Sequence, residues 1–286
     1  MIRELAENPN VHQVQPTGYG LHRDPADRFA IYLAPGTVPE AATVQRVRLR
    51  AGTVEPALAD VRAFLHARGR AGAEWELGES CTPLGLVERL LALGLTWIEE
   101  EPVSIGMVLR GAPSGEPPPG VTARQVTSLE ALVAGREIQR QAFGDPRHID
   151  LDQARRDLES EGVTGATFLA WVDGEPAAAA YAAYTSLGVI LFGGATLPEA
   201  RGRGAYRALV AARAVEAEKR GTATLVTHAG HMSRPILERL GFEPVARIDR
   251  LMDVLPRSEG LPRGSTGRSR PTRPSQAAAS SGSHTG

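Results

Sequence analysis

The sequence predicts an α/β fold built in two halves. Short apolar runs typical of strands alternate with amphipathic helical segments along most of the 286 residues. In the second half a strand, a glycine–arginine loop and a long helix follow one another directly over residues 189–221. The segment 111–120 contains four prolines, which interrupt both helices and strands, so we expect a linker between the halves there.

The composition limits the class of protein. Apolar residues make up 42% of the chain, enough for a substantial core, and the formal net charge is −1, so nucleic acid is not expected as a partner. The single cysteine, Cys81, excludes an intrachain disulfide and fits a reducing compartment. No run approaches the roughly 18 apolar residues of a membrane span, and residues 1–10 lack the apolar core of a signal peptide. We therefore expect a cytoplasmic protein with no membrane partner.

The first half begins with a polar stretch. Residues 1–24 contain prolines and glycines and predict an arm with little core of its own. Beyond them, alternating patterns and apolar stripes at helical spacing predict four strands and two helices. The strands are expected at 29–33, 44–49, 73–77 and 103–109, and the helices at 55–68 and 83–94.

The second half predicts a longer series of elements. Strands are expected at 121–126, 167–172, 177–184, 189–192, 222–227 and 245–255, and helices at 127–142, 150–162, 205–221 and 233–241. Thr127 and Glu130 form the pattern of a capping box, and Asp150 is the expected cap of the next helix. Asp173-Gly174 predicts a tight hairpin. Residues 256–286 have five Arg, one Glu and almost no apolar residues, which predicts a disordered tail.

The loop at the start of the long helix has the chemistry of a phosphate cradle. Gly202 and Gly204 allow close approach of the backbone, and the following helix directs its free N–H groups and positive dipole end to the same point. Three nearby arginine side chains suit a polyanionic ligand. They are Arg201, Arg203 and Arg207.

This loop resembles the pyrophosphate loop of the GNAT superfamily of acyl-CoA N-acyltransferases, which reads Arg/Gln-x-x-Gly-x-Gly/Ala between a strand and a helix. It matches at Arg201 and Gly204 and departs at Tyr206, where a small residue is usual. The predicted order of the second half, β-α-α-β-β-β-α-β-α-β, is also the GNAT order. The resemblance covers 121–255 and implies a mixed, mostly antiparallel sheet flanked by helices.

The first half repeats part of this pattern. Residues 74–95 and 225–242 both read strand, hydroxyl residue, proline, helix with Glu-Arg-Leu, and then Leu-Gly. The repetition predicts a smaller, degenerate GNAT-like half, the alternative being a coincidence between two common helix patterns. Because the first half has no Arg-x-x-Gly loop, we expect one acyl-CoA site per chain. The expected domains are a degenerate half at 1–110, a linker at 111–120, a GNAT N-acetyltransferase domain at 121–255 and a tail at 256–286.

The resemblance implies transfer of an acetyl group from acetyl-CoA, as co-substrate, to a primary amine of a small molecule or peptide by direct attack. It also implies backbone contacts to the pantetheine arm at a bulge, which Gly193-Gly194 predicts because paired glycines weaken a regular strand. The expected acetyl-CoA contacts are Gly194, Ala195, Thr196, Arg201, Gly202, Arg203, Gly204, Ala205, Tyr206 and Arg207.

The side-chain catalysts are less defined by the sequence. His228, at the end of its strand, is the first candidate for a general base, with a structural hydrogen-bonding role as the alternative. His231 and Tyr184 are weaker candidates. Many GNAT enzymes have a tyrosine that protonates the leaving thiolate, and the matching position is Leu237.

No histidine or cysteine pair has metal-ligand spacing, so no metal is expected. Two other functions stay open: a non-catalytic acyl-CoA-binding regulatory module, and an adaptor that binds peptide or nucleic acid through the tail and first half. The sequence does not predict the oligomeric state.

Overall fold

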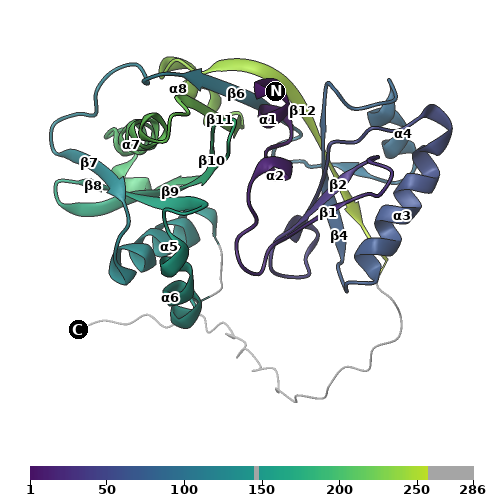
Figure 1. Cartoon of the computed structure of the whole chain (residues 1–286), viewed down its shortest axis with the longest axis horizontal. Helices are drawn as coiled ribbons and strands as arrows, with labels where there is room; N and C mark the ends of the chain where they lie inside the picture. Colours follow the sequence, from purple (N-terminus) through teal and green to yellow (C-terminus); the bar gives the residue numbers. More distant parts are fainter. Residues whose placement is uncertain (145–147, 257–286) are drawn as a thin grey trace, which may run out of the picture. The chain divides into compact units, whose positions relative to one another are not determined.

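The computed structural model describes residues 1–144 and 148–256 (Figure 1). The predicted tail lies outside the described residues apart from Pro256. Within the described residues, no helix is long and apolar enough to span a bilayer.

The second half has the predicted order of elements. They are β7 (Val121–Gln125), α5 (Leu129–Phe143), α6 (Leu151–Ser160), β8 (Gly165–Val172), β9 (Glu175–Tyr184), β10 (Val189–Thr196), α7 (Ala205–Lys219), β11 (Thr224–Ala229), α8 (Arg234–Arg239) and β12 (Glu243–Val254). The hairpin at Asp173-Gly174 is confirmed, and both residues have positive φ, 52° and 90°. Asp150 caps α6 by accepting from the backbone N–H groups of Asp152 and Gln153.

The first half contains the predicted strands and helices together with elements that the sequence did not indicate. Its elements are α1 (Ile2–Glu7), α2 (Pro9–His12), β1 (Gly20–Arg23), β2 (Ala30–Leu33), β3 (Ala42–Gln45), α3 (Val54–His66), β4 (Gly72–Gly78), α4 (Leu86–Ala92), β5 (Thr96–Trp97) and β6 (Val103–Arg110). The strand expected at 44–49 instead spans 42–45, because the backbone turns to a φ of 54° at Arg46.

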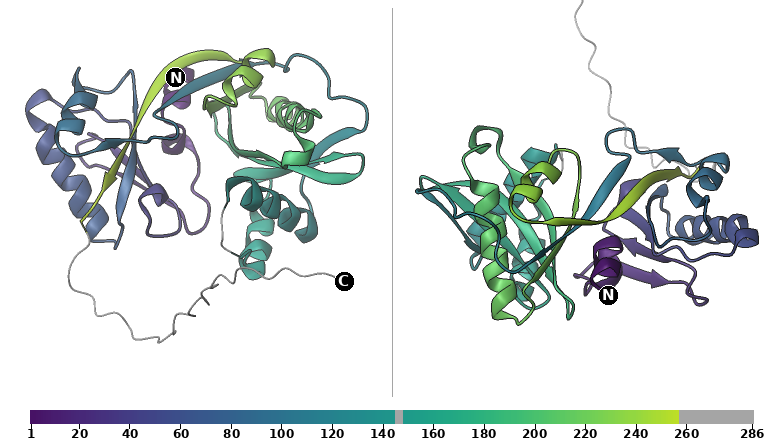
Figure 2. Two further views of the ribbon diagram at one scale, coloured as in Figure 1. Left: turned by 180° about the vertical axis from the view of Figure 1, so that it is seen from behind. Right: turned by 90° about the horizontal axis from the view of Figure 1, so that it is seen from above.

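One sheet joins both halves, in the order β1-β2-β3-β4-β12-β6-β11-β10-β9-β8-β7, with β5 beside β12. The order is symmetric about its centre, since β3 and β4 are parallel in one half and β10 and β11 are parallel in the other. The last strand of each half is exchanged: β6 pairs with β11, and β12 pairs with β4. Figure 2 shows β6 and β12 crossing between the two groups of strands. The first half therefore repeats the strand order of the second half without a counterpart of β7.

The helices divide between the two faces of the sheet. The register of the strands places the cores under α3 and α4 and under α7 and α8 on one face. The opposite face carries α1 in the middle, where Leu5 and Ala6 pack against Ile190 and Val226, and α5 and α6 beyond it. The segment 111–120 has no helix or strand, and the domain division proposed there stays a prediction.

The predicted arm at 1–24 is wrong for its first part. Leu5 and Ala6 of α1 are fully buried, and a Cβ at Gly106 would lie 2.6 Å from the Ala6 carbonyl oxygen, so glycine allows α1 to lie directly on β6. The helices α1 and α2 are too short to show a repeated apolar spacing in the sequence. Their burial depends on distant strands, which local patterns do not reveal.

Two smaller expectations are also corrected. Ser128, not Thr127, caps α5 by accepting from the backbone N–H of Ala131. The helical spacing of apolar residues predicts a buried side of α7 formed by Ala205, Ala208, Leu209, Ala212 and Val215. Val215 is instead 51% exposed, whereas Arg213 is 1% exposed. An alanine-rich helix has little contrast between its faces, so its pattern did not define the buried side.

Candidate functional site

The two parallel strands of the second half separate partway along their length. β10 and β11 pair only at Val189 with Leu225 and at Ile190 with Val226. Beyond this point the register of β10 against β9 shifts between Phe192 and Ala195, which confirms the bulge predicted at Gly193-Gly194. The strands therefore leave an opening in the sheet beside the bulge.

A cleft of about 1180 Å³ passes through this opening. On the face covered by α7 it is lined by Leu191, Arg213 and Thr227. On the face covered by α1 and α5 it is lined by Tyr181, Phe192 and His228 of the second half and Tyr19, Tyr32 and Glu76 of the first. Because residues on both faces line one cavity, a long ligand has a path through the sheet.

The glycine–arginine loop lies between β10 and α7. Gly202 and Gly204 have φ of 75° and 90°, so both need the left-handed conformation that glycine adopts without strain. Within the described residues, the backbone N–H groups of Gly204, Ala205 and Tyr206 have no backbone acceptor, as expected at a helix start. The loop thus presents free donors together with the positive end of the α7 dipole.

The three arginines of the loop differ in their partners. Arg203 forms an ion pair with Asp173, and Nη1 of Arg207 donates to the Glu116 carbonyl oxygen at 3.3 Å. The Arg201 side chain is exposed and has no hydrogen bond or ion pair within residues 1–144 and 148–256. Arg201 is therefore the loop arginine that is free to bind an anion.

Two glycines of the predicted site are packed closely against other side chains of the chain. A Cβ at Gly204 would lie 2.5 Å from Cδ of Pro118, so the proline-rich segment packs on the loop. A Cβ at Gly194 would lie 2.7 Å from Cε2 of Tyr206. The ring of Tyr206, where GNAT proteins usually have a small residue, is therefore accommodated by the absence of a side chain at Gly194.

His228 projects from β11 between groups that both favour its protonated form. Its Nε2 lies 2.9 Å from the Ala6 carbonyl oxygen, which can only accept, so Nε2 carries a proton. Its Nδ1 lies 3.7 Å from Oε1 of Glu76. Burial would lower the pKa of His228, but the charge and hydrogen bonding of Glu76 and the Ala6 carbonyl outweigh it, and the pKa is raised.

Glu76, on β4 of the first half, is a site residue that the sequence reasoning missed. Burial would raise its pKa, but His228 and a hydrogen bond from Gln45 lower it instead. The signal in the sequence was weak: Glu74 and Glu76 alternate with apolar residues on one strand, a pattern equally typical of a solvated face. Only the pairing of β4 with β12 brings Glu76 to the second half.

Arg213 was also missed. Its Nε donates to the Leu209 carbonyl oxygen at 3.0 Å and its Nη1 to the Tyr181 carbonyl oxygen at 3.4 Å. Its Nη2 is buried and has no hydrogen-bond partner within the described residues. Burial lowers the pKa of Arg213 to about 10, although the nearby Tyr206 hydroxyl acts in the opposite direction.

The other candidates lie outside the cleft. His231 is exposed and pairs with Glu101, and the ring of Tyr184 packs under the guanidinium of Arg220. Burial raises the pKa of the Cys81 thiol, which disfavours a nucleophilic thiolate. Leu237 is fully buried in the core beneath α8. Within the described residues, no group of histidine, cysteine or acidic side chains could hold a metal ion.

The corresponding opening of the first half is filled by the chain itself. β3 and β4 pair only at Thr43 with Glu74 and at Val44 with Trp75. Beyond this point the Glu7 carboxylate accepts from the Ser80 backbone N–H at 2.6 Å.

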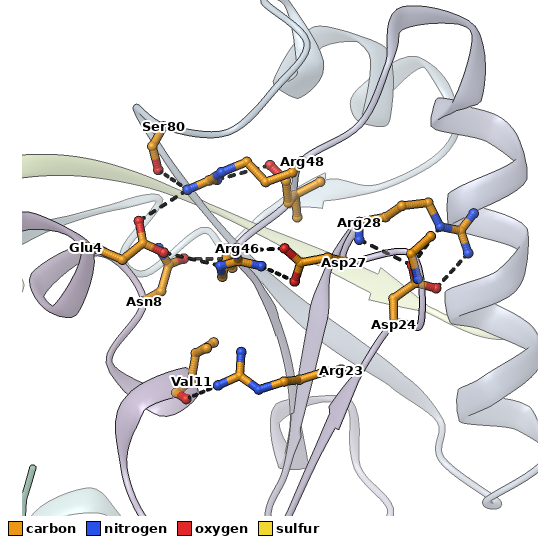
Figure 3. A network of polar contacts seen from close by, with 12 residues as sticks. Glu4, Asn8, Val11, Arg23, Asp24, Asp27, Arg28, Arg46, Arg48 and Ser80 are labelled. Atoms are coloured by element: carbon orange, nitrogen blue, oxygen red, sulfur yellow. Dashed lines mark hydrogen bonds and ion pairs between the residues drawn. The ribbon is translucent and has the colours of Figure 1, made fainter. Parts of the chain in front are cut away.

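Side chains of the N-terminal segment also bond the end of β3. Asn8 Oδ1 accepts from the Arg46 backbone N–H at 2.8 Å, and Glu4 contacts the side chains of Arg46 and Arg48 (Figure 3). Arg48 in turn donates to Ser80 Oγ at 2.7 Å. The N-terminal segment thus occupies the opening of the first half that corresponds to the cleft of the second.

Solved structures with the same fold identify the architecture. A GCN5-related N-acetyltransferase from Kribbella flavida is 23% identical with a TM-score of 0.62, covering 88% of this chain and 95% of that one. A tandem GNAT protein from the clavulanic acid biosynthesis pathway is 17% identical with a TM-score of 0.57, covering 90% and 89%. A GCN5-related N-acetyltransferase from Sphaerobacter thermophilus is 17% identical with a TM-score of 0.58, covering 85% and 82%.

No protein-family model and no curated protein matches the sequence. The two matches cover 88% and 90% of this chain, so the similarity to these solved structures extends over both halves. The chain therefore has the GNAT acyltransferase fold, with a second, smaller GNAT-like unit before the main one.

Proposed function

We propose that this chain is an N-acyltransferase that transfers the acyl group of an acyl-CoA, in the simplest case acetyl-CoA, to a primary amine of a small molecule or peptide. The observation that carries the proposal is the cleft through the sheet. It connects the face covered by α7 to the face that bears His228 and Glu76. The anion-binding loop, residues 201–207, lies at the start of α7, and its Tyr206 lines the cleft. A thioester held on one face can thereby meet an amine held on the other.

The loop provides the affinity for CoA in this proposal. The pyrophosphate would accept hydrogen bonds from the free N–H groups at the start of α7, and the exposed Arg201 would add charge. Gly194, Ala195 and Thr196 supply the backbone groups beside the bulge for the pantetheine arm. Since Arg203 and Arg207 already have partners, their contribution depends on exchanging those contacts.

His228 and Glu76 form the proton acceptor. The amine nitrogen attacks the thioester carbonyl carbon, the C–S bond then breaks, and the CoA thiolate departs. An amine of pKa near 10 is protonated at neutral pH and must first lose a proton. Glu76 would attract the ammonium group, and Nδ1 of neutral His228 would take its proton. A thiol with a pKa of about 8.5 leaves with little assistance, so the absence of a tyrosine at Leu237 is tolerated.

The proposal is tested by incubating the full chain with acetyl-CoA and a broad panel of amines. We expect one free thiol per amide formed, and no acyl group retained on Cys81. His228→Gln should lower the rate at neutral pH by roughly 100-fold, the usual loss when a general base is removed. His231→Gln is the matched control, because His231 lies outside the cleft, and it should keep the wild-type rate.

CoA binding without turnover across the panel would favour the regulatory acyl-CoA-binding module instead. An unchanged rate in His228→Gln would remove His228 from the mechanism. Failure to bind any CoA ester would reject the proposed function.

A further inference from the structure

The buried guanidinium of Arg213 has no counter-ion. No carboxylate of the described residues forms an ion pair with it. The Tyr206 hydroxyl acts on it through charge and hydrogen bonding, but a neutral phenol supplies no counter-charge. The side chain is 1% exposed, so bulk water does not solvate it. Burying an unpaired charge is costly, and a buried donor without a partner in a folded protein calls for an explanation.

The position of Arg213 indicates what could pair with it. Two of its nitrogens are fixed by the carbonyl oxygens of Leu209 and Tyr181, while Nη2 is left without a partner in a side chain that lines the cleft. Tyr181 lies opposite Phe192, at the edge of the bulge. The guanidinium is therefore next to the opening between β10 and β11.

The distance along α7 between the anion-binding loop and Arg213 indicates which part of a CoA ester would lie near the guanidinium. Arg213 is eight residues after Ala205 at the start of α7, which places it about 12 Å along the helix axis at 1.5 Å per residue. A CoA ester anchored by its pyrophosphate at the loop would extend along α7 toward the opening. Its thioester end, rather than its phosphates, would lie near Arg213.

We infer that Arg213 binds a carboxylate at the end of the acyl chain, so that the preferred donor is a carboxyacyl-CoA, the thioester of a dicarboxylic acid. The inference rests on the proposed function and specifies its donor. A carboxylate supplies both the missing charge and an acceptor for Nη2, and a guanidinium is well matched to it in geometry. A neutral acyl chain would leave the buried charge without a counter-ion.

The test compares two esters of equal chain length. Calorimetry with the full chain measures the dissociation constants of succinyl-CoA, butyryl-CoA, acetyl-CoA and free CoA. Succinyl-CoA should bind at least about tenfold more tightly than butyryl-CoA, the difference that one charge-assisted contact typically provides. Arg213→Met should abolish this preference and leave the affinity for free CoA unchanged. The control Arg220→Met, at the C-terminal cap of α7 and outside the cleft, should retain the preference.

Three outcomes would overturn the inference. Equal affinity of the wild type for succinyl-CoA and butyryl-CoA does so without any variant, so the test stands even if Arg213→Met fails to fold. If Arg213→Met lowers the affinity equally for all ligands, including free CoA, the guanidinium would instead contact the pantetheine arm. Retention of the preference in Arg213→Met would make Arg213 a structural residue. In each case CoA binding itself would leave the proposed function intact.

Discussion

His228 of the second half and Glu76 of the first half face each other in one cleft, with 3.7 Å between Nδ1 and Oε1. The contact exists because β12 runs from the second half into the first and pairs with β4, which carries Glu76. The strand exchange thus makes the proposed active site a product of both halves. Neither half would contain the pair alone.

The pH dependence of acyl transfer should reveal this pair. We expect the rate to rise with pH as His228 loses its Nδ1 proton, with a midpoint above 6.5, the usual pKa of histidine, because its pKa is raised. Glu76→Gln removes the charge that holds this proton, so the midpoint should move to lower pH. The measurement is kcat/KM against pH for wild type and variant. A midpoint that does not move would show that Glu76 does not act on the titrating group.

The same pair should make stability depend on pH. His228 has a raised pKa, so its contribution is complete below pH 6.5 and is lost as the pH rises through the folded-state value. Glu76 has a lowered pKa, so its contribution is present above pH 4.5 and is lost as the pH falls through the folded-state value. The free energy of unfolding lost in His228→Gln should therefore be greatest between these limits.

Chemical denaturation at about pH 5.5 and about pH 9 measures this difference. The loss in His228→Gln should be smaller at the higher pH. His231→Gln is the control and should show a small effect at both values, because His231 is exposed. A larger loss for His228→Gln at about pH 9 would contradict the assigned protonation.

Local signals in the sequence were sufficient for much of the second half. Asp173-Gly174 defined a hairpin and Gly193-Gly194 a bulge, because each depends on backbone conformations that few residues adopt. The loop at 201–207 could also be predicted, because its glycines and arginines are adjacent in the chain. The order of the elements, predicted from these local patterns, then matched that of GNAT proteins.

The sequence could not predict features that depend on contacts between distant segments. Alternation of apolar residues tells which side of β4 is buried, but not that its neighbour is β12, so Glu76 was not connected to His228. Arg213 lies among alanines, where no contrast distinguishes a buried position from an exposed one. The burial of Leu5 and Ala6 depends on Gly106, far along the chain.

The filled opening of the first half predicts a single CoA site. Titration of the full chain should give one equivalent of CoA, because Glu7 and Asn8 already bond the backbone groups at 80 and 46. Glu7→Ala should lower the free energy of unfolding by about 1–3 kcal/mol, since it leaves the partly buried N–H of Ser80 without its partner. Glu88→Ala, at an exposed glutamate, is the control. A second equivalent of comparable affinity would show that the N-terminal segment does not close this opening.

The two glycines of the loop should respond differently to the same substitution. In Gly202→Ala the added Cβ has no atom within 4 Å, so the only cost is the strain of an alanine in the left-handed conformation, at a φ of 75°. We expect a cost of about 1–2 kcal/mol in the free energy of unfolding. Gly204→Ala adds to that strain a contact of 2.5 Å with Pro118, so the proline-rich segment must move. Its cost should be clearly greater. Denaturation of both variants without ligand measures the difference, and equal costs would mean that Pro118 does not pack on the loop.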